Sequence, residues 1–105
     1  MSLCNYSIFI DGGLGKYIAK NLPEEIKQVF DDKMKYFSNN PHHPSLNTKK
    51  YNANPKTLRR LGVDEIWEFY INRKTYRCVF YVVHSEKQII IAFVGNHQQT
   101  KNKFT

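Results

Sequence analysis

Hydrophobic and polar positions alternate most clearly in the second half of the chain, between residues 64 and 97. Three runs rich in β-branched and aromatic residues lie there, and two short polar breaks, residues 72–74 and 84–87, separate them. Runs of this kind with short polar breaks are typical of strands joined by hairpins. The pattern therefore predicts a three-stranded antiparallel meander, and the rest of the chain is expected to fold around it.

Side chains of a strand point alternately to the two faces of its sheet, so parity assigns each residue to one face. One parity is wholly apolar, and we expect helices to cover it: Trp67, Phe69, Ile71, Cys78, Phe80, Val82, Ile90, Ala92 and Val94. The other parity mixes apolar with polar and charged side chains: Glu68, Tyr70, Arg77, Val79, Tyr81, Ile91, Phe93, Gly95 and His97. This second face is either a half-exposed surface with scattered polar residues or a functional surface.

The pattern in the first half of the chain predicts a strand, a turn and two helices, and the helices would cover the apolar face. Residues 6–11 form a short apolar run that ends at a pair of glycines, which predicts a first strand and a turn. The stretch from Gly12 to Lys16 lacks the spacing of a phosphate-binding loop, so we interpret it as a strand-to-helix turn. Two helices are predicted next, over residues 14–22 and from Pro23 to Asn39.

The remaining segments are polar. Residues 41–51 predict a loop that leads into a short extended piece, and residues 55–61 a helical turn that Gly62 ends. The tail after His97 is either a short helix or a frayed end. With 105 residues, the chain is expected to form a single α+β domain, in which the N-terminal strand and two helices pack on the antiparallel meander.

The chain is basic, with 16 Lys and Arg, nine Asp and Glu, and a formal net charge of +7. The excess is uneven, because residues 33–63 hold seven basic residues and no acid. A polyanionic partner would explain this distribution. The alternative is solvated surface charge that keeps the protein in solution.

The cysteines, the histidines and the hydropathy of the chain indicate in which compartment the protein works and whether it binds a metal or a membrane. Cys4 and Cys78 have no metal-ligand spacing, and we interpret both as reduced thiols of a cytoplasmic protein. His42 and His43 are adjacent without a second pair at ligand spacing, so no metal site is expected. No signal peptide is visible and no apolar run approaches membrane-spanning length, so we expect no membrane partner.

Five short motifs follow one another along the chain: Asn-Pro-His-His-Pro-Ser-Leu at 40–46, Lys-Lys-Tyr at 49–51, Ile-Trp-Glu-Phe at 66–69, Tyr-Arg-Cys-Val-Phe at 76–80 and Val-Gly-Asn-His at 94–97. In this order they resemble the Asn-Pro-x-His-Pro-Ser-Leu turn, the Lys-Lys-Leu, the first meander strand, the Tyr-Arg-Val-x-Phe and the closing Val/Ile-Gly-x-His of the RelE/ParE superfamily of bacterial and archaeal toxin–antitoxin toxins. The chain departs from the family in a longer span between Lys50 and Trp67, and in a tail without the Asp and Tyr that often follow His97. The resemblance implies a single RelE-like domain over residues 1–105.

The resemblance also implies the toxin of a type II toxin–antitoxin system, an mRNA interferase that cuts messenger RNA on the ribosome without a metal ion or cofactor. In metal-free cleavage the 2′-hydroxyl attacks the adjacent phosphate, while a base, an acid and cations assist. His97 is the expected acid or base, since imidazole exchanges protons near neutral pH. Arg77 would bind the phosphate, and Lys49 and Lys50 could hold the scissile phosphate or its neighbour. Glu68 is either a base or the residue that orients Arg77.

The other candidates for RNA binding are basic side chains and an aromatic ring: Lys49, Arg59, Arg60, Arg73, Tyr81, Lys101 and Lys103. Either Tyr81 or Tyr70 could stack on a base. Two further functions stay open. Some relatives poison DNA gyrase and cut nothing, and a basic domain could also bind RNA without toxicity. Every toxin hypothesis implies a cognate antitoxin, acidic and partly disordered, that lays a helix or strand over the basic face.

Overall fold

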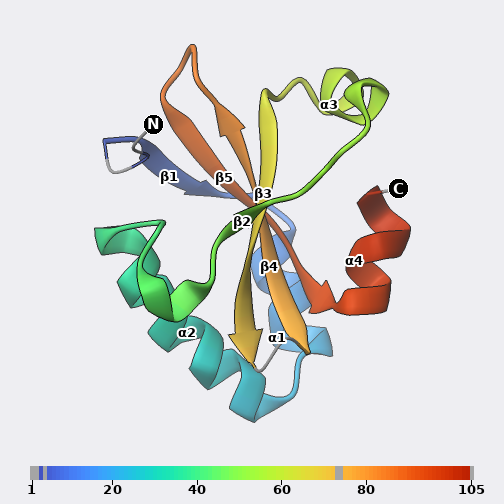
Figure 1. Ribbon diagram of the computed structural model, residues 1–105. Helices are drawn as coiled ribbons and strands as arrows, with labels where there is room; N and C mark the ends of the chain where they lie inside the picture. Colours follow the sequence, from blue (N-terminus) through green and yellow to red (C-terminus); the bar gives the residue numbers. More distant parts are fainter. Residues whose placement is uncertain (1–2, 4, 73–74, 105) are drawn as a thin grey trace.

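A five-stranded sheet with the strand order β1-β5-β4-β3-β2 forms the centre of the protein (Figure 1). The computed structural model describes residue 3, residues 5–72 and residues 75–104. Its strands are β1 (Ser7–Ile10), β2 (Lys49–Lys50), β3 (Glu65–Asn72), β4 (Tyr76–Val83) and β5 (Gln88–Asn96). Its helices are α1 (Leu14–Asn21), α2 (Glu24–Asn39), the short 3-10 turn η1 (Pro44–Leu46), α3 (Pro55–Leu61) and α4 (His97–Phe104).

The predicted α+β class and the antiparallel meander are both confirmed. β3 pairs antiparallel with β4, and β4 pairs antiparallel with β5. The first strand, β1, adds to the far side of β5 in parallel, so the complete sheet is mixed. None of the helices among the described residues is long and apolar enough to cross a membrane.

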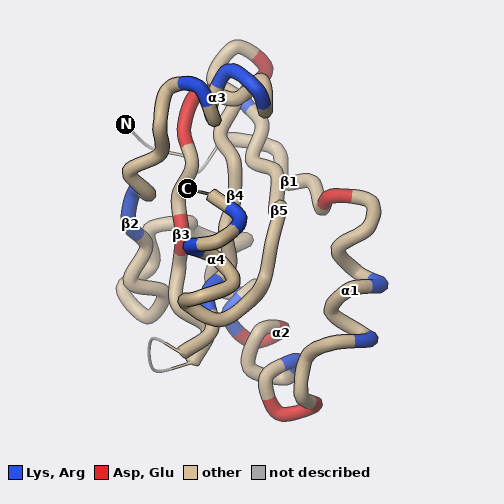
Figure 2. The backbone as a smooth tube through the Cα atoms, turned by 90° about the vertical axis from the view of Figure 1, so that its right-hand side faces the viewer, with Lys and Arg blue, Asp and Glu red and all other residues tan. Residues whose placement is uncertain are grey.

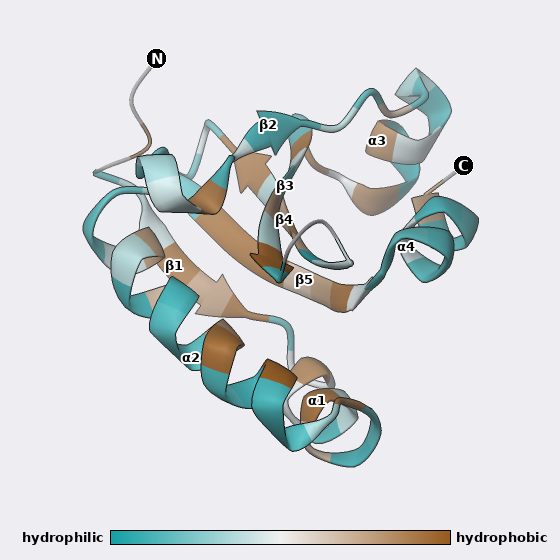
Figure 3. Ribbon diagram, turned by 60° about the horizontal axis from the view of Figure 1, so that its bottom comes forward, coloured by the Kyte–Doolittle hydropathy of each residue, from teal (hydrophilic) through white to brown (hydrophobic). Residues whose placement is uncertain are grey.

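Helices α1 and α2 cover the face of the sheet that was predicted to be apolar. The buried stripe of α2 consists of Ile26, Phe30 and Phe37, as its periodicity predicts. The Phe37 ring lies at the centre of this core, with its centroid 5.1 Å from that of Phe69 and 4.9 Å from that of Phe80. In Figure 3 much of β1 and β5 has the brown colour of hydrophobic residues, whereas β2 is teal.

Cys78 belongs to the same core. Its side chain is a free thiol with no exposed surface, and burial raises the pKa of that thiol. Cys78 is therefore a small apolar packing residue of the sheet. The interpretation of Cys4 as a reduced thiol falls outside the described residues.

A β-bulge in β5 overturns part of the predicted face assignment. Val79 pairs with Phe93, but the next residue of β4, Phe80, pairs with Ile91, so Ala92 is the extra residue. Simple alternation placed Ile90 with the helix-covered core and Ile91 on the opposite face. The bulge exchanges them, and Ile91 is fully buried beneath the helices while Ile90 is only partly buried.

The opposite face of the sheet is partly covered as well, which parity alone does not predict. Helices α3 and α4 pack on it around a small cluster of buried residues, Ile66, Val79 and Phe104. The predicted helical turn over residues 55–61 is confirmed as α3. Its start is capped by the Asn54 side chain, which accepts a hydrogen bond from the Lys56 N–H (2.8 Å), and Gly62 ends it in a left-handed conformation at φ 70°. The polar tail is helical too, and this helix, α4, packs against β4 and β5.

Candidate active site

A reciprocal cap fixes His97 as the first residue of α4. The Asn96 side chain accepts a hydrogen bond from the Gln99 backbone N–H (2.8 Å), and the Gln99 side chain accepts one from the Asn96 N–H (2.9 Å). This is a capping box, the arrangement that starts a helix at a defined residue. His97 therefore begins the helix that folds back over the sheet instead of ending β5, and its side chain is exposed.

Gly95 makes room for this cap. A Cβ atom at residue 95 would lie 2.8 Å from Oε1 of Gln99 and 2.8 Å from the Phe93 ring, closer than real contacts allow. Gly95 pairs with Arg77 across β4 and β5. The Gly-x-His spacing thus lets α4 turn directly above Arg77.

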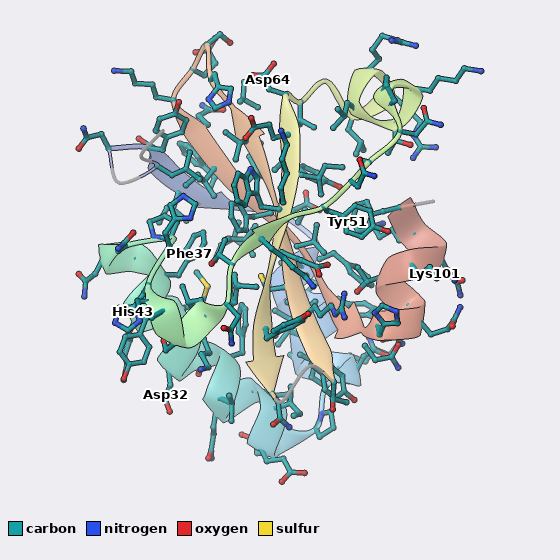
Figure 4. The ribbon with its side chains drawn as sticks, in the orientation of Figure 1. Asp32, Phe37, His43, Tyr51, Asp64 and Lys101 are labelled. Atoms are coloured by element: carbon teal, nitrogen blue, oxygen red, sulfur yellow. The ribbon has the colours of Figure 1, made fainter. Side chains whose placement is uncertain are left out.

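Arg77 and His97 line the same surface hollow. Its volume is about 270 Å³, and its lining residues are Tyr51, Arg77, His97, Thr100 and Lys101. The hollow lies between the start of α4, the middle strands and the segment that follows β2. In Figure 4 the labelled Tyr51 lies beside α4, the helix that carries Lys101.

A buried ion pair lies beneath this surface. Nη1 of Arg77 donates to Oε1 of Glu68 at 2.8 Å, and the two side chains are 12% and 3% exposed. The second Glu68 oxygen, Oε2, and Nε of Arg77 are buried without a hydrogen-bond partner in the described part of the structure. Glu68 therefore holds the guanidinium in place from inside the domain, as one of its two predicted roles requires.

Lys49 joins this pair from β2. Lys49 is opposite Glu68 in the antiparallel pairing, and its Nζ lies 3.8 Å from Oε1 of Glu68. The Tyr70 ring lies beside both cations, with its centroid 5.1 Å from Nζ of Lys49 and 5.0 Å from Cζ of Arg77. These contacts align two positive charges on one face of the sheet.

The structure does not bring Lys50 to this face. Lys50 is opposite Trp67, and its Nζ lies 3.6 Å from the Glu65 carboxylate, on the side of the sheet that α2 covers. The same carboxylate accepts a hydrogen bond from Trp67 Nε1 (2.8 Å) and lies 3.4 Å from His84 Nε2. Burial acts to raise the Glu65 pKa, but the contacts with Trp67, His84 and Lys50 outweigh it and lower that pKa. The phosphate role expected of Lys50 fits Lys49 better.

The other predicted RNA-binding residues are spread over the same side of the molecule. Arg59 and Arg60 are exposed on the last turn of α3. Lys103 lies over the rings of Phe93 and Phe104, with Nζ 5.5 Å and 6.0 Å from their centroids. Figure 2 shows the basic residues of β2, α3 and α4 along the part of the molecule away from α1. Arg73 lies outside the described residues.

Tyr81 is separate from the hollow that holds Arg77 and His97. It lines a second hollow of about 590 Å³ on the same face, together with Ile90 and Ala92. Burial raises the pKa of its phenol, and the nearby Asp11 acts in the same direction. If Tyr81 stacks on a base, it would therefore do so outside the hollow that contains Arg77 and His97.

Tyr51 and Thr100 were not among the predicted site residues, yet both line the hollow. Burial and the neighbouring Glu68 carboxylate raise the pKa of the Tyr51 phenol, against the opposing effect of Arg77. No group of His, Cys, Asp and Glu side chains within residue 3, 5–72 or 75–104 has the geometry of a metal site. The side chains that line the hollow are a phenol, a hydroxyl, an imidazole, a guanidinium and an ammonium group.

Comparison with known proteins supports the fold. A crystal structure of an archaeal RelE–RelB complex from Pyrococcus horikoshii OT3 matches with a TM-score of 0.62 at 16% identity, over 87% of this chain and 93% of that chain. The isolated E. coli RelE toxin matches with a TM-score of 0.57 at 15% identity, over 93% and 95% of the two chains. A metal-bound toxin from Helicobacter pylori matches with a TM-score of 0.54 at 10% identity, over 90% and 97%.

No protein-family model and no curated protein matches the sequence. The structural likenesses nevertheless span nearly the whole length of each compared chain. They establish that this chain has a RelE-like fold, as the five motifs imply.

Proposed function

We propose that this protein is the toxin of a toxin–antitoxin system and arrests translation as a metal-independent endoribonuclease that cuts messenger RNA on the ribosome. One observation carries the proposal: Arg77 from β4 and His97 from α4 line one hollow on the basic side of a RelE-like domain. An exposed imidazole beside a guanidinium is the combination that phosphate-ester cleavage needs.

The proposed roles follow from position. His97 transfers a proton at the reacting oxygen, because it is the exposed imidazole in the hollow. Arg77 binds the scissile phosphate, since its guanidinium is held by Glu68 and presents further N–H donors. Lys49 and Lys101 add positive charge on either side. Glu68 positions Arg77, because a carboxylate with 3% exposure has little access to a substrate.

The test measures cleavage of one messenger RNA, both free in EDTA and on translating ribosomes. The wild-type protein is expected to cut it, and Arg77→Lys to cut it at least about tenfold more slowly, because Lys keeps the charge but loses the fork of donors. Lys35→Ala is a matched control that removes an exposed charge from α2 and should leave the rate unchanged. Intact RNA with wild-type protein under both conditions would refute the nuclease.

Other outcomes identify the alternatives. Growth arrest that survives loss of His97, with DNA-damage signalling and uncut RNA, would indicate a gyrase poison. RNA binding that weakens steeply with salt, without arrest on expression, would indicate a non-toxic RNA-binding domain.

The toxin proposal also includes a partner, an acidic and partly disordered antitoxin that covers the basic side of the domain. The net charge of +7 and the cations of β2, α3 and α4 favour an acidic chain there. Co-expression with a small acidic protein encoded beside the gene is expected to restore growth and to co-purify in a salt-sensitive complex. A neighbour that restores growth without binding the protein would count against this partner.

A further inference from the structure

Tyr51 is anchored at the edge of the candidate site. Its backbone N–H donates to the carbonyl oxygen of Ile66 at 2.8 Å, which extends the pairing of β2 with β3 by one residue. Its ring packs edge-on against Phe104 of α4, with the centroids 5.9 Å apart. A side chain fixed by both the sheet and α4 can present a group to the hollow without reorganisation.

Hydroxyl groups that could donate to a substrate are few among the side chains that line the hollow. The Thr100 hydroxyl donates to the carbonyl oxygen of Asn96 at 2.9 Å, so its proton is used in a hydrogen bond within α4. The other lining side chains, apart from Tyr51, are Arg77, His97 and Lys101. Tyr51 is thus the residue that brings a neutral O–H group alongside them.

The state of the phenol suits such a donor. A phenol is protonated and neutral at pH 7. Burial and the Glu68 carboxylate raise the pKa of Tyr51 further, against the opposing effect of Arg77. A preorganised donor next to a phosphate contributes most when charge grows on the phosphate oxygens in the transition state.

We propose that Tyr51 is a further catalytic residue, whose hydroxyl donates a hydrogen bond to a non-bridging oxygen of the scissile RNA phosphate. The inference rests on the proposed endoribonuclease function. In that reaction the 2′-oxygen forms a bond to phosphorus and the bond from phosphorus to the 5′-oxygen breaks. The 2′-proton passes to a base and the 5′-oxygen receives a proton from an acid. Tyr51 keeps its own proton throughout.

The first test compares single-turnover cleavage of one RNA by wild type, Tyr51→Phe and Tyr36→Phe. Tyr51→Phe keeps the ring and its packing but loses the hydroxyl. We expect the maximal single-turnover rate to fall about 10- to 100-fold, with little change in the protein concentration that gives half of that rate. Tyr36→Phe removes a hydroxyl from an exposed ring on α2 that stacks on His43, and it should cleave like wild type.

The second test replaces each non-bridging phosphate oxygen by sulfur, a weaker hydrogen-bond acceptor. Wild type should cut one of the two phosphorothioate diastereomers more slowly than the oxygen substrate, and Tyr51→Phe should lose most of that discrimination. A structural role of Tyr51 would slow all three substrates alike. This difference keeps the test informative even if the variant is less stable.

The outcomes separate the two proposals. If wild type cuts RNA, His97→Ala does not and Tyr51→Phe cuts as fast as wild type, the Tyr51 inference fails and the nuclease stands. A slow Tyr51→Phe that retains the wild-type discrimination against sulfur would also overturn the inference. If wild type cuts nothing on or off ribosomes, both proposals fall together.

Discussion

Replacement of His97 by alanine is expected to lower the rate of RNA cleavage by about 10²- to 10⁴-fold, the usual contribution of a general acid or base. His97 is exposed at the start of α4 and shares the hollow with Arg77, while the capping box that holds the helix uses Asn96 and Gln99. The substitution therefore removes the imidazole and leaves the cap intact. Thermal stability should change little, since the side chain is at the surface.

His42→Ala provides a matched control for this experiment. His42 is also exposed, but it lies in the loop after α2, where its ring meets the edge of Trp67 at a centroid distance of 5.4 Å. Single-turnover cleavage by this variant should equal that of wild type. The proposed role of His97 would be wrong if both histidine variants cut RNA at the wild-type rate.

Parity was a reliable guide where the strands are regular. The pairing of Glu68 with Val79 and of Tyr70 with Arg77 places these residues as alternation predicts. It failed at Ile90 and Ile91, because a single extra residue, Ala92, reverses the faces of one half of β5. Nothing in a run of apolar residues shows where such a bulge lies, since either register buries side chains of the same kind.

The two lysines of β2 show the same limit. Adjacent residues of a strand point to opposite faces, so Lys49 and Lys50 cannot both face Arg77. Which of them does is decided by the register of β2 on β3, which pairs Lys49 with Glu68 and Lys50 with Trp67. The sequence therefore predicted a phosphate-binding lysine pair, whereas the structure places one lysine with Glu68 and the other with Glu65.

The sequence contains a signal that predicts the C-terminal helix, although the tail was expected to be either a short helix or a frayed end. Asn96 followed three residues later by Gln99 is the signature of a capping box, and it predicts a helix that starts at His97. Tyr51 could not be recognised in this way. It becomes part of the site only because α4 folds back over the sheet and brings Phe104 against its ring.

Removal of the Glu68 carboxylate is expected to have the largest effect on stability. Glu68→Ala would leave the Arg77 guanidinium, with 12% exposure, without its partner, and breaking a buried ion pair in this way costs about 3–5 kcal/mol. Urea denaturation followed by circular dichroism would measure this loss. Glu65→Ala is a control on the same strand, because that carboxylate is 23% exposed and water can replace its contacts, so the loss should be smaller.

A double variant separates the stability of the pair from its role in the reaction. Glu68→Met combined with Arg77→Met replaces both charges by apolar side chains of similar length, and such replacements of buried pairs are often neutral or stabilising. We expect the double variant to regain most of the stability lost in Glu68→Ala and yet to cut no RNA, because the phosphate-binding guanidinium is gone. A stable double variant that still cuts at the wild-type rate would show that the pair is a structural feature of the sheet. A double variant as unstable as Glu68→Ala would instead mean that the hydrogen bond between Arg77 and Glu68 in the wild-type protein, and not only the balance of their charges, holds β3 and β4 together.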